Sequence, residues 1–108
     1  MTILTSTEDK VSRILVAFAS QGKTVTFTEI MQNAGIGRGG IGKCLSHIGT
    51  KCKELGLPAI TSIVVYKGTK KVGSGYAEFD PDFESHPKEV EKEQKRVFGE
   101  QFWDPLFL

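Results

Sequence analysis

Long apolar runs are missing from this sequence, and their absence excludes a membrane-spanning segment. A transmembrane helix needs about 20 consecutive apolar residues, and no stretch of the chain approaches that length. The opening residues, MTILTSTEDK, also lack the basic and then apolar regions of a secretory signal. We therefore expect a soluble, cytoplasmic protein without a membrane partner.

Cysteine is scarce, with Cys44 and Cys52 as the only two. They lie eight residues apart in one expected helix, about 12 Å along its axis, which is too far for a disulfide. Cys44 and His47 have i, i+3 spacing, but the chain has no second pair at the spacing of zinc ligands. We expect two reduced thiols, no metal site and no cofactor.

Catalytic patterns are missing as well. The glycine-rich segment 35–42 lacks the Gly-Lys-Ser/Thr ending of a phosphate-binding P-loop. Cys44 and His47 have no evident third residue that would orient them as a nucleophile and its base. The sequence therefore predicts a protein that is not an enzyme.

The chain does contain enough apolar material for one core. It has 108 residues, of which 39% are hydrophobic, and this size is typical of a single domain. We predict one domain over 1–108, with a body over residues 1–79. The segment 80–108 then contributes an acidic loop, a C-terminal helix and an apolar tail.

Three helices are expected in the body. Thr5–Glu8 and Thr26–Glu29 have the T-x-x-E spacing of capping boxes, and apolar periodicity follows each of them. These patterns predict helices over about 8–20 and 27–34. A further apolar period predicts a third helix over about 39–54.

The rest of the chain predicts strands and a fourth helix. The β-branched segment 60–66 is typical of a strand, and 76–79 predicts a second strand after the basic loop 67–75. Pro87 opens a helix that extends to about Phe98. Because three helices followed by a hairpin is the winged-helix order, we predict an α+β fold. It has a winged-helix-like three-helix core, a β-hairpin wing, a C-terminal helix and an aromatic tail.

Charge is spread unevenly along the chain. Residues 1–75 carry ten Lys and Arg against four acids, a balance of +6, whereas residues 76–108 carry four bases against nine acids, a balance of −5. Such asymmetry concerns binding partners and not fold. A basic body fits a phosphate backbone, and an acidic segment fits a basic protein.

The basic residues predict a DNA-binding surface. In a winged helix the third helix enters the major groove and the hairpin tip contacts the backbone. The residues that would do so here are Arg38, Lys43, Ser46, His47, Thr50, Lys51, Lys67, Lys70 and Lys71. The same pattern is also typical of an amphipathic helix whose polar face is only solvated, and this interpretation stays open.

Residues 24–79 resemble the winged-helix domain of alkyltransferases and alkyltransferase-like proteins, which recognise damaged bases in DNA. The resemblance rests on Val25–Ile30, on Gly37–Gly42, and on Pro58 with the Val-Val and Gly-Ser-Gly segments that follow it. It implies a DNA partner. The family's Pro-Cys-His-Arg motif is missing, because Ala59 follows Pro58, so alkyl transfer is not implied.

Part of the same segment, 56–65, also resembles small phage and bacterial proteins and N-terminal modules of some nucleases. This second resemblance implies a mobile-element or defence-related setting, and it supplies no mechanism.

The acidic residues offer an alternative function. They can imitate a phosphate backbone, as in an inhibitor or adaptor that binds a host protein, for example a phage-encoded antagonist of a host defence nuclease. The residues that would form this surface are Glu78, Asp80, Asp82, Glu84 and Glu89. A solvated acidic loop explains the same pattern.

The C-terminal tail is aromatic and needs burial. Phe102, Trp103 and Phe107 either dock on the three-helix core or form a homodimer seam, since exposed aromatic residues at a terminus make an adhesive patch.

Overall fold

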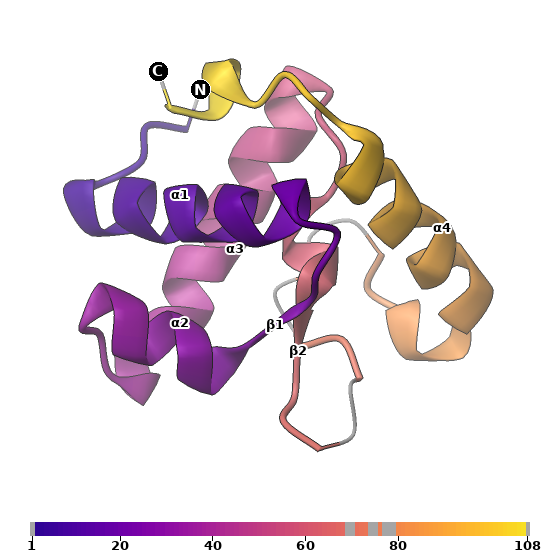
Figure 1. The fold of residues 1–108 in the computed structure, drawn as a ribbon, viewed down its shortest axis with the longest axis horizontal. Coiled ribbons are helices and arrows are strands. Elements are labelled where there is room, and N and C mark those ends of the chain that lie inside the picture. Colours follow the sequence, from indigo (N-terminus) through magenta and orange to yellow (C-terminus); the bar gives the residue numbers. More distant parts are fainter. Residues whose placement is uncertain (1, 69–70, 74–75, 77–79, 108) are drawn as a thin grey trace.

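A computed structural model describes residues 2–68, 71–73, 76 and 80–107 (Figure 1). The elements in chain order are α1 (Ser6–Ser20), β1 (Val25–Thr26), α2 (Phe27–Ala34), α3 (Arg38–Leu55), the 3-10 helix η1 (Ile60–Ile63), β2 (Val64–Val65), η3 (Phe83–Ser85), α4 (Pro87–Gly99) and η4 (Asp104–Phe107). No helix in the described ranges is long and apolar enough to cross a membrane.

Both predicted capping boxes are confirmed, and α2 begins at Phe27 as predicted, whereas α1 begins two residues before its predicted start. In both boxes the threonine hydroxyl accepts from the glutamate backbone N–H, and the glutamate carboxylate accepts from the threonine backbone N–H. The four bonds are 3.0–3.2 Å long. Each box satisfies two backbone donors that the first turn of a helix leaves without a partner.

A short turn joins α2 to α3 in a helix-turn-helix arrangement. Gly35 ends α2 in the left-handed region at φ 69°, and Gly37 is the N-cap of α3. A residue with a side chain is strained at a positive φ, so Gly35 allows the chain to reverse here without cost. α3 begins one residue before its predicted start and ends one residue after its predicted end.

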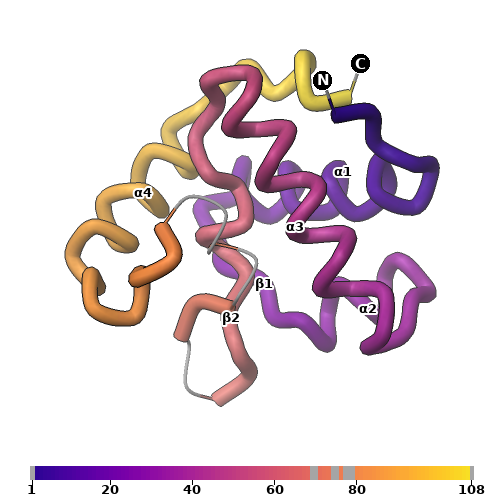
Figure 2. Tube along the Cα trace, turned by 180° about the vertical axis from the view of Figure 1, so that it is seen from behind, coloured from indigo at the N-terminus to yellow at the C-terminus, as the bar shows by residue number. Residues whose placement is uncertain are grey.

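The core lies between α1, α2 and α3. Leu15 of α1, Ile30 of α2, and Leu45 and Ile48 of α3 have no exposed surface, and they belong to one apolar cluster. In Figure 2, α3 crosses in front of α1, so one side of α3 packs inward and the other faces outward.

The prediction of an α+β winged-helix fold with a β-hairpin wing is wrong. The described chain is mainly helical, and its one sheet has two strands, β1 and β2, which pair in parallel. Within the predicted strand 60–66, Ile60–Ile63 is a 3-10 helix. Tyr76, the start of the predicted second strand, lies in a turn and donates its backbone N–H to Gly73, while 77–79 lie outside the described residues.

Side chains of α4 explain why residues 59–63 do not extend into a strand. Glu93 accepts a hydrogen bond from the backbone N–H of Ala59 (2.6 Å), and Gln94 donates to the carbonyl of Ser62 (2.9 Å). These side chains occupy backbone groups that a neighbouring strand would otherwise pair. Residues 59–65 are buried throughout, so their β-branched composition reflects burial and not a hairpin.

The fourth helix and the tail complete the molecule. Pro87 occupies the first turn of α4 as predicted, where its missing N–H costs nothing. The tail crosses back over the body, so the two chain ends lie close together (Figure 1). They lie at the end of the molecule opposite α2 and the chain after β2 (Figures 1 and 2).

Candidate nucleic-acid interface

The exposed side of α3 carries glycines and basic residues at its N-terminal end. Arg38 and Lys43 are exposed, as are Gly39, Gly40 and Gly42. No acidic residue lies in the first turn, and Gly37 supplies no side-chain cap. The start of α3 therefore presents backbone N–H groups and two cations, a combination that favours anions.

The glycines of this surface are not required by packing. A Cβ added at Gly39, Gly40 or Gly42 would meet no described atom within 4 Å outside its own helix backbone and chain neighbours. Glycine inside a helix costs about 1 kcal/mol relative to alanine. Packing within the described chain does not explain why glycine occupies these positions despite its cost. A partner that approaches the helix backbone closely would explain it.

The second half of the predicted α3 surface is engaged within the protein. Lys51 is 5% exposed, and its Nζ donates to the carbonyl of Leu106 at 2.9 Å. The Thr50 hydroxyl donates to the carbonyl of Ser46 (3.0 Å), and both residues are half-buried. The sequence reasoning placed Lys51 on the DNA-binding face, but the structure uses it to hold the tail.

His47 of α3 pairs with Glu8 of α1. Its Nδ1 lies 2.6 Å from Oε2 of Glu8, which is 5% exposed. Burial alone would raise the pKa of Glu8, but the hydrogen bonds from the Thr5 backbone and His47 outweigh it, so this pKa lies below its ordinary value. Burial and the nearby Glu8 carboxylate raise the pKa of Cys44.

The two cysteines are free and buried, as expected for reduced thiols. Burial raises the pKa of Cys52 to about 11. Burial therefore favours the protonated form of both thiols, which is the less nucleophilic form. The described residues contain no group of three His, Cys, Asp or Glu that could hold a metal ion.

A second basic segment follows β2. Lys67 and Lys71 are exposed, and Lys70, the third predicted lysine, lies outside the described residues. The backbone N–H of Tyr66 donates to the carbonyl of Lys71 at 2.8 Å. This bond places the backbone of Lys71 across from Tyr66, the residue before Lys67.

An aromatic pair missed at the sequence level lies beside these lysines. The rings of Phe27 and Tyr66 are 5.0 Å apart between centroids and tilted by 31°. Phe27 is half-buried and Tyr66 is 49% exposed. The two residues are far apart in sequence, and they meet because β1 and β2 are paired immediately before them.

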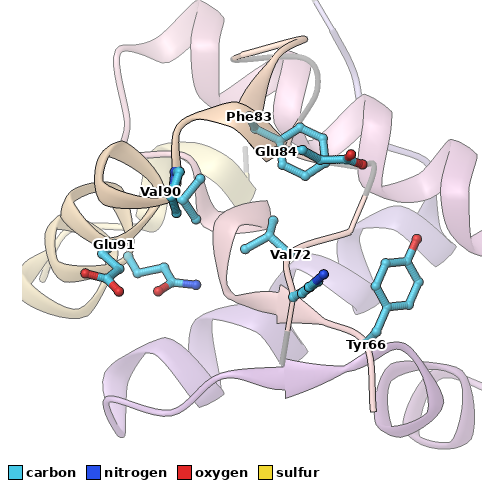
Figure 3. Close-up of a pocket in the computed structure, with 9 residues that line it drawn as sticks. Tyr66, Val72, Phe83, Glu84, Val90 and Glu91 are labelled. Atoms are coloured by element: carbon cyan, nitrogen blue, oxygen red, sulfur yellow. The ribbon is translucent and has the colours of Figure 1, made fainter. Parts of the chain in front are cut away.

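Tyr66 also lines a pocket of about 530 Å³ (Figure 3). Val72, Phe83, Pro87 and Val90 supply its apolar lining, and Lys71, Glu84, Glu91 and Gln94 its polar groups. Figure 3 shows Tyr66 on one side of the pocket, with Phe83 and Glu84 facing it from another segment. The volume lies within the range of about 300–1,000 Å³ that is typical of ligand pockets.

The predicted acidic surface is only partly open. Asp80 lies 2.7 Å from His86 Nδ1 and also accepts from the backbone N–H of Asp82. The bond to His86 lowers the pKa of Asp80 and raises that of His86. Asp82 and Glu84 are exposed. Glu89 is exposed too, 4.0 Å from Lys92, and Glu78 lies outside the described residues.

The aromatic tail docks on the body. Trp103 is 4% exposed and belongs to the main core, and Arg13 lies over the ring of Phe107 at 4.3 Å from its centroid. Trp103 is therefore not available for the homodimer seam that was considered from the sequence. Phe102 is different, because it is 63% exposed.

Comparisons with known proteins found no relative of this chain. No family model, no curated protein and no solved structure matches the chain.

Proposed function

We propose that this protein binds DNA without catalysing a reaction, through the first half of α3 and the basic segment after β2. The observation that carries the proposal is the start of α3, where Arg38 and Lys43 flank exposed glycines that no packing requires. A helix that follows a helix-turn-helix turn is a common element for entering a DNA groove.

The chemistry of this surface favours backbone contact over base reading. Lysine and arginine bind phosphates, and glycine brings the helix backbone and its N–H groups close to them. Exposed amide and carboxylate side chains, which read adenine and cytosine, are missing from residues 37–43, so guanine is the only base that Arg38 and Lys43 can read. We therefore expect binding that depends strongly on salt and weakly on sequence.

A charge-reversal experiment tests the proposal. The double substitution Arg38→Glu and Lys43→Glu should abolish binding to a labelled duplex at roughly 50–100 mM salt. The matched control is Lys88→Glu with Lys92→Glu, which changes net charge equally on exposed positions of α4 and should leave most of the affinity.

The salt dependence gives a second measurement. Each phosphate contact contributes a slope of about −0.9 to log K against log salt, so loss of two contacts should reduce the slope by about 1.8 if binding remains measurable. The proposal is wrong if the unmodified protein shows no salt-dependent binding to any duplex or single strand, or if both double variants lose affinity equally.

A further inference from the structure

We infer that Tyr66, supported by Phe27, is a stacking platform for an unpaired base of single-stranded DNA. This inference rests on the proposed DNA binding and adds to it a second contact point, which takes an unpaired base beside the α3 surface. Tyr66 is exposed enough to stack on a base. Its ring packs near Phe27, yet 49% of the residue remains accessible to solvent.

The Phe27 ring that supports Tyr66 is itself held in place by its surroundings. A Cβ on Gly73 would overlap the outer ring carbons of Phe27, so the backbone at Gly73 lies directly against that ring. Phe27 is also the first residue of α2, where the Thr26 capping box fixes the backbone. Because Tyr66 packs against this held ring, its side chain has less conformational freedom to lose on binding, which favours stacking.

Two lysines beside the platform can bind the phosphates of a nucleotide. Lys67 follows Tyr66 in sequence, and Lys71 lies across from it through the 2.8 Å backbone hydrogen bond. Cations beside an exposed aromatic ring are the combination with which proteins hold single strands, the lysines on phosphates and the ring on a base.

The pocket next to Tyr66 offers groups that can bind the edge of a base. Its lining has Lys71 at the Tyr66 segment and the carboxylates of Glu84 and Glu91 at η3 and α4. A nucleotide with its phosphate toward Lys71 would turn its base edge toward these carboxylates, which accept hydrogen bonds from exocyclic amino groups. Val72 and Val90 supply apolar contact between them.

The position of the platform is compatible with the α3 surface. In both views, α2, the start of α3 and the chain after β2 lie at the same end of the molecule (Figures 1 and 2). A single strand that contacts Arg38 and Lys43 can therefore continue toward Tyr66 at the same end.

The test uses a single-stranded oligonucleotide that contains 2-aminopurine, whose fluorescence is quenched when it stacks. The unmodified protein should quench the probe and bind it, and Tyr66→Phe should preserve both properties. Tyr66→Ala should remove the quenching and weaken binding roughly 5- to 150-fold, the effect of losing one stacked base. Phe102→Ala removes an aromatic residue elsewhere that is even more exposed, at 63% against 49% for Tyr66, and should change neither.

A second variant tests whether misfolding explains the loss of binding in Tyr66→Ala. Tyr66→Leu keeps an apolar side chain against Phe27 but has no aromatic face, so it should behave as Tyr66→Ala while the thermal midpoint stays close to that of the unmodified protein. If Tyr66→Leu quenches and binds as the unmodified protein does, the platform is overturned.

The outcomes separate this inference from the proposed function. If Arg38→Glu with Lys43→Glu loses DNA while Tyr66→Ala and Tyr66→Leu behave normally, the α3 proposal stands and the platform falls. If the Tyr66 variants lose quenching and affinity while the α3 variant keeps duplex binding, the platform stands and the α3 proposal falls. Absence of binding to every oligonucleotide overturns both.

Discussion

At the residue scale, the same capping motif serves two different purposes. Glu8 and Glu29 each close a capping box on a preceding threonine. Glu29 caps its helix, whereas Glu8 caps its own helix, is 5% exposed and also lies 2.6 Å from His47 of α3. The T-x-x-E spacing predicted both caps, but the His47 contact joins residues 39 positions apart, and no local pattern carries that information.

The two boxes provide a matched pair of substitutions. Glutamine can still cap a helix at this position, so Glu29→Gln should change the free energy of unfolding by less than about 0.5 kcal/mol. Glu8→Gln removes a buried charge next to His47 and should cost about 1–3 kcal/mol at neutral pH. Urea titration of both variants measures the difference, and equal losses would show that the Glu8–His47 contact contributes nothing.

The pH dependence of Glu8 has a definite sign. Its pKa is lower in the folded protein than its ordinary value, so ionised Glu8 stabilises the fold above the ordinary pKa of about 4.3. That contribution is lost as the pH falls through the folded-state pKa. The stability difference between the unmodified protein and Glu8→Gln should therefore shrink below about pH 4, and a difference that grows on acidification would contradict this account.

At the element scale, α3 shows how far periodicity predicts structure. Its apolar period placed the helix to within one residue at each end, because Ile41, Leu45 and Ile48 define the buried side. The same reasoning failed for residues 60–66, where every side chain up to Val65 is buried and no alternation exists to separate a strand from a 3-10 turn. The side chains that decide the matter, Glu93 and Gln94 of α4, come 34 and 32 residues after the backbone groups that they bind.

The glycines of α3 lead to a prediction with opposite effects on stability and binding. Gly39→Ala with Gly42→Ala should raise the free energy of unfolding by about 1–2 kcal/mol, because nothing described opposes the added methyl groups. The same change should weaken DNA binding about tenfold, since the added methyl groups would keep the helix backbone farther from the phosphates. Thermal unfolding and a DNA titration measure the two effects.

A control separates binding from stability. Gly99 is the last residue of α4, and an added Cβ there also meets no described atom within 4 Å. Gly99→Ala should leave DNA affinity unchanged. If the α3 double variant is more stable and binds DNA as well as the unmodified protein does, the glycines do not mark a contact surface.

At the scale of the whole molecule, the tail closes the fold against α1 and α3. The buried Lys51 ammonium donates to the carbonyl of Leu106, and Trp103 and Leu106 join the main core. The tail's aromatic composition indicated docking or dimerisation without deciding between them. Lys51 was assigned to the DNA surface because a lysine is normally exposed, and only the tail's position explains why this one is buried.

The adjacent residues Trp103 and Phe102 test whether the tail stabilises the single chain or an assembly. Trp103→Ala should lower the free energy of unfolding by about 3–5 kcal/mol, as expected for a fully buried aromatic side chain. Phe102→Ala should change it by less than about 0.5 kcal/mol, because this side chain is 63% exposed. If instead Phe102→Ala is strongly destabilising, and the loss grows with protein concentration, then Phe102 is buried between two copies and the homodimer alternative holds for that residue. Urea titrations at two protein concentrations, followed by circular dichroism, distinguish these results.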